Sequence, residues 1–73
     1  MADLVIYTVP GCNTCARAVQ EMTDEGIEFE ERDIHKNAQW LEEASRLAVT
    51  VPILVRGNRI EVGWRGDSGC LFQ

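Results

Sequence analysis

The first 25 residues constrain the fold most, because a buried strand pattern leads directly into a helical one. The run Leu4–Thr8 is apolar and rich in β-forming residues without alternation, which predicts a strand buried on both faces of a sheet. A helical pattern then runs from Cys12 to about Glu25, and Gly26 is a suitable C-terminal stop. Its apolar residues recur at three-residue steps, at Ala16, Val19 and Met22. Cys12 therefore stands at the expected N-terminus of a helix.

Two further elements follow in the middle of the chain. From Ile27, apolar and acidic residues alternate as in a half-buried strand, and this pattern reaches Asp33 or Ile34. Asn37 is a suitable N-cap for a second helix that reaches about Ala48 and has one apolar and one charged face. The chain thus alternates strand, helix, strand and helix before its last third.

The remaining part of the predicted sheet is a hairpin. Ile53–Val55 and Arg59–Val62 flank Gly57 and Asn58, a two-residue loop of the kind that closes tight hairpins. The resulting order β-α-β-α-β-β, without repeats or linkers, predicts an α/β fold. We expect residues 1–73 to form a single domain, with one four-stranded mixed sheet, helices packed on it and a short C-terminal turn.

Length and charge exclude several classes of function. The 73 residues suffice for one domain only, and the formal net charge of −5 disfavours nucleic acids and anionic membranes as partners. No apolar run approaches the roughly 20 residues that span a bilayer. Met1 is followed by Ala2 and Asp3 instead of the basic residues that begin a signal peptide. We therefore expect a cytoplasmic protein.

Cys12 and Cys15 have the spacing of a redox-active cysteine pair. Disulfide exchange needs a thiolate that attacks and a second thiol close enough to release the mixed disulfide. The free N–H groups and the positive dipole end of a first helical turn favour the thiolate form of Cys12. Cys15 lies one turn further along the same face and can close an intrachain disulfide. The sequence therefore predicts a thiol-disulfide oxidoreductase with Cys12 as the nucleophile and Cys15 as the resolving thiol.

Two other classes of function stay open at this point. Cys12 and Cys15 could form half of a zinc site that Cys70 and His35 complete, although a pair between a buried strand and an amphipathic helix is more typical of redox chemistry. The chain could also be a redox-sensitive binding partner that does not turn over. Outside a zinc site, we expect His35 to be a solvated loop residue and Cys70 to pack near the end of the chain. Cys70 could instead resolve a second disulfide or join two chains.

Two separated motifs make the chain resemble the glutaredoxin family within the thioredoxin-like fold, over essentially its whole length. The first motif is Y-T-x-P-x-C-x-x-C, carried by Tyr7, Thr8, Pro10, Cys12 and Cys15. The second motif is T-V-P, carried by Thr50, Val51 and Pro52. The resemblance implies a minimal glutaredoxin that carries electrons in cell redox homeostasis by reducing disulfides in client proteins.

The T-V-P motif carries a prediction about substrate binding. In relatives, the matching proline is in the cis form and faces the cysteine pair, so that the residue before it offers its backbone to a peptide or to glutathione. The resemblance implies the same for Pro52 and Val51, because a cis X-Pro bond interrupts regular sheet. A trans proline at the start of an edge strand is the alternative. The binding residues implied so far are Pro10, Thr50, Val51 and Pro52.

A third stretch, Gly63 to Asp67, is similar to the G-F-R-x-D segment of NrdH-type redoxins, the electron donors of ribonucleotide reductase. In the wider family this loop contacts the substrate. The resemblance therefore adds Gly63, Trp64 and Asp67 to the binding surface, with Asp67 beginning a last helical turn. A flexible loop in which Trp64 caps a small core is the alternative.

Departures from both families leave two electron sources and two oligomeric states open. Val9 stands where glutathione-using relatives carry a lysine, and Glu61 replaces the aromatic residue of NrdH-type redoxins. The reductant is either glutathione, as a cosubstrate, or thioredoxin reductase, and the exchange itself needs no metal or organic cofactor. We expect a monomer, with a dimer through apolar surface near Leu71 and Phe72 as the alternative.

Overall fold

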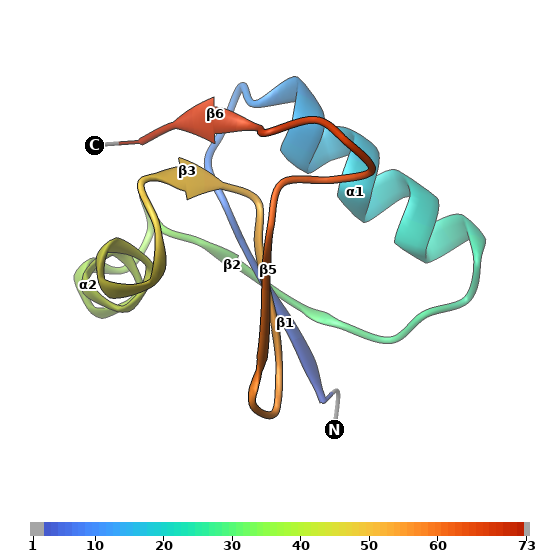
Figure 1. Ribbon diagram of the computed structural model, residues 1–73, viewed down its shortest axis with the longest axis horizontal. Coiled ribbons are helices and arrows are strands. Elements are labelled where there is room, and N and C mark those ends of the chain that lie inside the picture. Colours follow the sequence, from blue (N-terminus) through green and yellow to red (C-terminus); the bar gives the residue numbers. More distant parts are fainter. Residues whose placement is uncertain (1–2, 73) are drawn as a thin grey trace.

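The computed structural model describes residues 3–72 of the chain (Figure 1). These residues form two helices and six strands, and the last four strands follow one another without a helix between them. Their bounds are β1 Leu4–Thr8, α1 Asn13–Asp24, β2 Glu30–Asp33, α2 Ala38–Leu47, β3 Thr50–Val51, β4 Ile53–Arg56, β5 Arg59–Val62 and β6 Cys70–Leu71.

The main sheet has four strands in the order β2-β1-β4-β5. β1 runs parallel to β2 and antiparallel to β4. The hairpin of β4 and β5 turns at Gly57, whose φ of 58° lies in the left-handed region that glycine adopts readily. The predicted α/β fold with a four-stranded mixed sheet is confirmed.

Alternate side chains of the sheet face two separate apolar clusters. On one face, Leu4 and Ile6 of β1 pack with Met22 of α1, and we call this group the α1 cluster. On the other face, Tyr7 of β1 packs with Ala44 of α2. Figure 1 shows the two helices on opposite sides of the sheet. Because successive strand residues point to opposite faces, the unbroken apolar run of β1 supplies both clusters, as the sequence predicts.

Both helices begin at the residues that the sequence indicates. Cys12 is the N-cap of α1, and the side chain of Asn37 caps α2 by accepting hydrogen bonds from two N–H groups of its first turn. Gly26 follows the end of α1 with a φ of 74°. Within residues 3–72, neither helix is long and apolar enough to cross a membrane.

Strand β2 begins at Glu30, three residues later than the alternation starting at Ile27 suggests. The N–H of Ile27 donates to the carbonyl oxygen of Met22 at 3.0 Å, so this residue is still hydrogen-bonded to the last turn of α1. Ile27 and Phe29 pack against the α1 cluster. Parallel pairing with β1 starts only where Glu30 lies opposite Val5. The alternation at Ile27 and Phe29 therefore indicates side chains that are packed against the α1 cluster before the strand begins.

The region after β5 differs from the prediction. Trp64 and Asp67 form an isolated antiparallel bridge, with hydrogen bonds of 2.8 and 2.9 Å in the two directions, and no helical turn begins at Asp67 among the residues described. The chain then extends into β6, which pairs antiparallel with β3. The helical turn expected to begin at Asp67 is wrong, because long-range strand pairing outweighs the weak helical tendency of a stretch that contains glycines at 66 and 69. Leu71 of β6 is 72% exposed, and the dimer stays a prediction.

Candidate redox site

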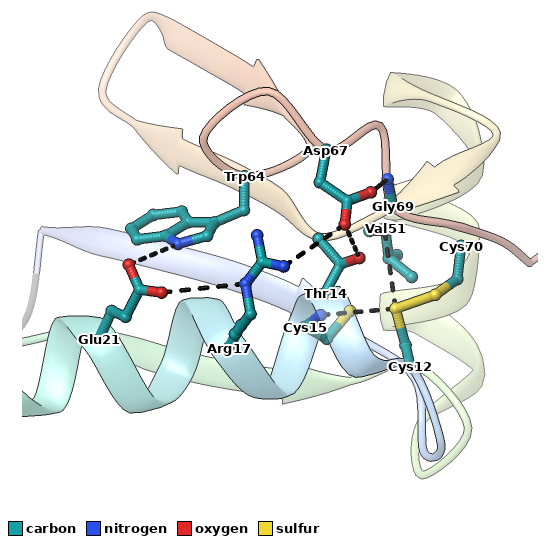
Figure 2. A network of polar contacts seen from close by, with 10 residues as sticks. All are labelled: Cys12, Thr14, Cys15, Arg17, Glu21, Val51, Trp64, Asp67, Gly69 and Cys70. Atoms are coloured by element: carbon teal, nitrogen blue, oxygen red, sulfur yellow. Dashed lines mark hydrogen bonds and ion pairs between the residues drawn. A yellow bond between two sulfur atoms is a disulfide. The ribbon is translucent and has the colours of Figure 1, made fainter.

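Cys12 lies where the chain turns from β1 into α1. Gly11, just before it, has a φ of 80°, which lets the strand lead directly into the helix. The Sγ atom of Cys12 accepts a hydrogen bond of 3.5 Å from the N–H of Cys15, as an N-cap side chain does (Figure 2). In the reduced protein, that donor and the helix dipole would both favour the thiolate form of this sulfur.

Cys15 lies one turn into α1, and its thiol is buried. Only 3% of Cys15 and 4% of Cys12 are exposed. Burial raises the pKa of the Cys15 thiol above its ordinary value, and a backbone hydrogen bond from Val9 opposes this shift in part. Cys15 therefore stays protonated at neutral pH, which suits a thiol that acts after the first attack.

The disulfide in the structure joins Cys12 to Cys70 and leaves Cys15 as a free thiol. The two bonded residues are 58 positions apart in sequence, and their Cα atoms are 6.0 Å apart. The expectation that Cys70 only packs near the end of the chain is wrong, because β6 carries it onto Cys12 beside the start of α1 (Figure 2). The catalytic roles of Cys12 and Cys15 stay predictions.

Val51 and Pro52 lie beside Cys12. The peptide bond between them is cis, as the resemblance implies, and both residues are fully buried. The carbonyl oxygen of Val51 is 4.0 Å from Cys12 Sγ. The Val51 backbone is not free for a substrate in this structure, because Val51 lies opposite Cys70 in the β3–β6 pair, and its role in substrate binding stays a prediction.

Asp67 fastens the loop after β5 to the first turn of α1. Its carboxylate accepts hydrogen bonds from the Thr14 hydroxyl at 2.9 Å and from the Gly69 N–H at 3.0 Å. The Arg17 guanidinium lies 3.8 Å away, and all of these residues appear in Figure 2. The Gly69 N–H, the Thr14 hydroxyl and the Arg17 charge together hold the pKa of Asp67 below its ordinary value.

Trp64 and Arg65 attach the same loop to α1 further along the helix. The indole N–H of Trp64 donates to Glu21 at 3.1 Å, and its ring packs against the α1 cluster. Arg65 forms ion pairs of 2.7 Å with Glu21 and with Glu25. Trp64 therefore caps an apolar core, as the alternative interpretation of this stretch predicts. The same interpretation predicts a flexible loop, whereas polar contacts attach this loop to α1.

The other predicted binding residues border this site. Pro10 is exposed in the turn before Cys12, and Thr50 is half-buried in β3. Gly63 donates its N–H to the carbonyl oxygen of Pro52 at 2.9 Å. A Cβ atom at Gly63 would overlap the backbone of Asp67, so this position requires glycine. The loop and the cis-proline segment thus form one wall beside the cysteines.

The structure brings together the three cysteines of the alternative zinc site but does not add His35 to them. His35 is exposed after β2, and its N–H donates to Asp33 at 2.9 Å. Cys70 is bonded to Cys12. Over residues 3–72, no group of three or more histidine, cysteine and carboxylate side chains is arranged to hold a metal ion.

Two residues of the site were not predicted from the sequence. Thr14 is buried and holds Asp67, which is 53 positions away, so no local pattern could indicate this contact. Gly69 approaches the Val51 backbone so closely that a Cβ atom there would overlap it. The glycine directly before Cys70 was the one available signal of this approach.

We expect Asp67→Asn to loosen the loop from α1, because an amide is a weaker acceptor than a carboxylate. A lowered folded-state pKa means that the carboxylate stabilises the fold above the unfolded value of 3.8, and that this contribution is lost as pH falls through the folded value. In NMR, the Gly69 amide shift should titrate with a midpoint below 3.8 in the wild type and not titrate in Asp67→Asn. A Gly69 titration that persists in the variant would contradict this assignment.

A mixed four-stranded sheet between two helices, with a C-x-x-C at the start of α1 and a cis proline beside it, defines a protein of the thioredoxin-like class. The glutaredoxin family model matches residues 4–60. The chain therefore belongs to the glutaredoxin family, and this membership supports a thiol-disulfide redox function.

The chain is also similar to a solved structure and to curated proteins. The structure is similar to the crystal structure of glutaredoxin grx-1 from Archaeoglobus fulgidus, with a TM-score of 0.75 and 24% identity over 89% of this chain and 78% of that one, which supports the fold. The chain is 32% identical to the gene 56 protein of Mycobacterium phage L5 over 56 residues, covering 74% of this chain and 54% of that protein. It is 34% identical to the gene 56 protein of Mycobacterium phage D29 over 55 residues, covering 71% and 60%. The chain thus spans little more than half the length of these two relatives.

Proposed function

We propose that this protein is a dithiol oxidoreductase that reduces disulfides in client proteins, with Cys12 as the nucleophile and Cys15 as the resolving thiol. One observation carries the proposal: Cys12 Sγ is the N-cap acceptor of α1 and receives the N–H of Cys15. The first sulfur is therefore placed for attack, and the second stays a buried thiol one turn away.

The reaction follows from these two positions. The Cys12 thiolate attacks one sulfur of a client disulfide, which forms a mixed disulfide and releases the other client sulfur as a thiolate. Cys15 then loses its proton and attacks Cys12 Sγ, which forms the Cys12–Cys15 bond and releases the second client thiolate. Two electrons pass to the client, and the oxidised pair needs an upstream reductant.

The client binds beside β3. An extended segment that pairs with the backbone of Val51 brings its own cysteine to Cys12. The other binding residues of this proposal are Pro10, Thr50, Gly63, Trp64 and Asp67. The Gly63 N–H donates to the Pro52 carbonyl oxygen at 2.9 Å and Asp67 accepts from Thr14 at 2.9 Å, which keeps their loop beside the cysteines. The binding is therefore carried by backbone pairing, which suits clients of different sequence.

Electron donation to ribonucleotide reductase, with recharging by thioredoxin reductase, is the second candidate function. The observation that favours it is Val9, which packs against the apolar cluster on the α2 face, where glutathione-using relatives carry a lysine. Glutathione stays a possible cosubstrate, and no other cofactor enters the exchange. A reductase of this kind works in a reducing compartment, and we place the protein in the cytoplasm.

The test is NADPH consumption with a protein disulfide substrate. One reaction contains thioredoxin reductase, the other contains glutathione and glutathione reductase, and Cys12→Ser serves as the blank. Turnover in either reaction supports the proposal and identifies the reductant. If NADPH is consumed in neither reaction, the proposed oxidoreductase activity is refuted. Metal analysis of the purified protein then distinguishes a zinc-binding module from a redox-sensitive binding partner.

A further inference from the structure

Cys70 has no part in the dithiol mechanism, yet it holds the sulfur of the proposed nucleophile. The Cys12–Cys70 bond closes a separation of 58 residues, and the buried Cys15 remains a thiol beside it (Figure 2). The N–H of Cys15 still donates to Cys12 Sγ at 3.5 Å while that sulfur is bonded to Cys70. A bonded sulfur and a free thiol thus share the first turn of α1.

Strand β6 is attached to the molecule as an extended peptide is attached to an exposed edge. Over residues 3–72, β3 has β6 as its strand partner and takes no part in the four-stranded sheet. The antiparallel register puts Cys70 opposite Val51, and the Phe72 N–H donates to the Val49 carbonyl at 3.1 Å. Because the Val51 carbonyl is 4.0 Å from Cys12 Sγ, a residue paired with Val51 is delivered to that sulfur.

Gly69 permits this approach. Its φ is 91°, and a Cβ atom there would overlap the Val51 carbonyl and touch the Pro52 ring. Its N–H donates to Asp67, which Thr14 holds against α1. Gly69 is therefore held in place by its hydrogen bond to Asp67, and the nearby Val51 backbone leaves no room for a side chain.

We propose that the segment from Ser68 to Phe72 is an intramolecular substrate of the redox site, and that Cys70 is a third redox-active cysteine. The Cys12–Cys70 bond is then an intramolecular mixed disulfide that Cys15 resolves. This inference rests on the proposed function of Cys12 and Cys15.

The exchange balances without an added oxidant or reductant. The Cys15 thiol loses its proton and its sulfur attacks Cys12 Sγ, so that the Cys12–Cys15 bond forms and the Cys12–Cys70 bond breaks. Cys70 leaves as a thiolate and takes up a proton. One disulfide remains in the molecule, and the departure of β6 exposes the backbone of Val51 to a client.

The test measures where the single disulfide lies. Wild type and Cys15→Ser are equilibrated in glutathione redox buffers, quenched in acid, and mapped by mass spectrometry. We expect Cys15→Ser to form a monomeric Cys12–Cys70 disulfide, and wild type to contain both Cys12–Cys70 and Cys12–Cys15. The proposal is overturned if Cys15→Ser carries glutathione on Cys12 with Cys70 free. It is also overturned if Cys15 never displaces Cys70 in wild type, since the bond is then purely structural.

A matched pair of glycine variants tests whether strand pairing delivers Cys70. Gly69→Ala places a methyl group against Val51, whereas Gly66→Ala has a similar φ of 87° and open space around the added atom. In the Cys15→Ser background, we expect Gly69→Ala to lower the effective concentration of Cys70 at Cys12 by about tenfold, and Gly66→Ala to lower it less than about threefold. Equal effects of the two substitutions would overturn the role of the β3–β6 pairing.

Cys70→Ser separates failure of this inference from failure of the proposed function. In this variant only the Cys12–Cys15 exchange can take place. Turnover of a protein disulfide by Cys70→Ser, combined with no Cys12–Cys70 bond in Cys15→Ser, would refute the inference and keep the proposed function. A Cys12–Cys70 bond in Cys15→Ser, combined with no turnover in wild type or Cys70→Ser, would refute the proposed function and with it the role of Cys15.

Discussion

Cys12→Ser is expected to abolish disulfide reduction, lowering kcat/KM by more than about 10³-fold. A serine hydroxyl does not ionise at neutral pH and has no sulfur to bond to the client, so no mixed disulfide can form. The measurement is the NADPH-coupled assay with whichever reductant supports wild-type turnover. Serine is also an N-cap residue, so α1 should keep its cap and the thermal unfolding midpoint of the reduced protein should change little.

Cys15→Ser is the matched control, because it also replaces a buried sulfur in the first turn of α1 with oxygen. We expect this variant to attack once and stop at a mixed disulfide of Cys12, either with the client or with Cys70. Mass spectrometry after acid quench detects both products. The opposite pattern, in which Cys12→Ser forms a stable client adduct through Cys15, would reverse the two roles. It would also contradict the inference that burial keeps the Cys15 thiol protonated.

The first two thirds of the fold could be predicted because local patterns and tertiary packing agree there. The apolar run of β1 supplies both clusters, and Cys12 and Asn37 cap the helices that follow them. The prediction of strand bounds is less accurate where a residue outside a strand is buried by packing. Ile27 has the alternation of a strand but still bonds to the end of α1. Alternation reports which side chains are buried, and it does not report where strand pairing begins.

The end of the chain could not be predicted, because its structure depends on contacts between distant residues. β6 has two residues, which is too short to carry a strand pattern, and it exists through pairing with β3. Asp67 is fixed by Thr14, 53 positions earlier, and Cys70 by Cys12, 58 positions earlier. The resemblance of two motifs to the glutaredoxin family predicted that Pro52 lies beside Cys12. Only the structure shows that a segment of the same chain lies where the client was expected.

Ile6→Ala is expected to destabilise the protein by about 3 kcal/mol, since Ile6 is fully buried in the middle of β1 and its loss leaves a cavity in the α1 cluster. Domains of this size have a total stability of roughly 4 to 11 kcal/mol, so this one substitution removes between about a quarter and three quarters of it, while most molecules stay folded in the absence of urea. The measurement is urea unfolding of the reduced protein, which keeps the Cys12–Cys70 bond out of the comparison. Ile60→Ala on β5 is the matched control: Ile60 is 49% exposed, and we expect a loss below about 1 kcal/mol.

The two isoleucine variants also test how the site depends on the sheet. Ile6 lies between residues of β1 that lead into the turn before Cys12, while Ile60 lies on the outer strand β5, away from the cysteines. If packing under β1 fixes the start of α1, Ile6→Ala should slow disulfide reduction even under conditions in which it is fully folded, and Ile60→Ala should not. Equal losses of stability in the two variants would mean that the α1 cluster relaxes around the cavity. Cys12 would then be held mainly by its helix cap and by the loop that Asp67 attaches to Thr14.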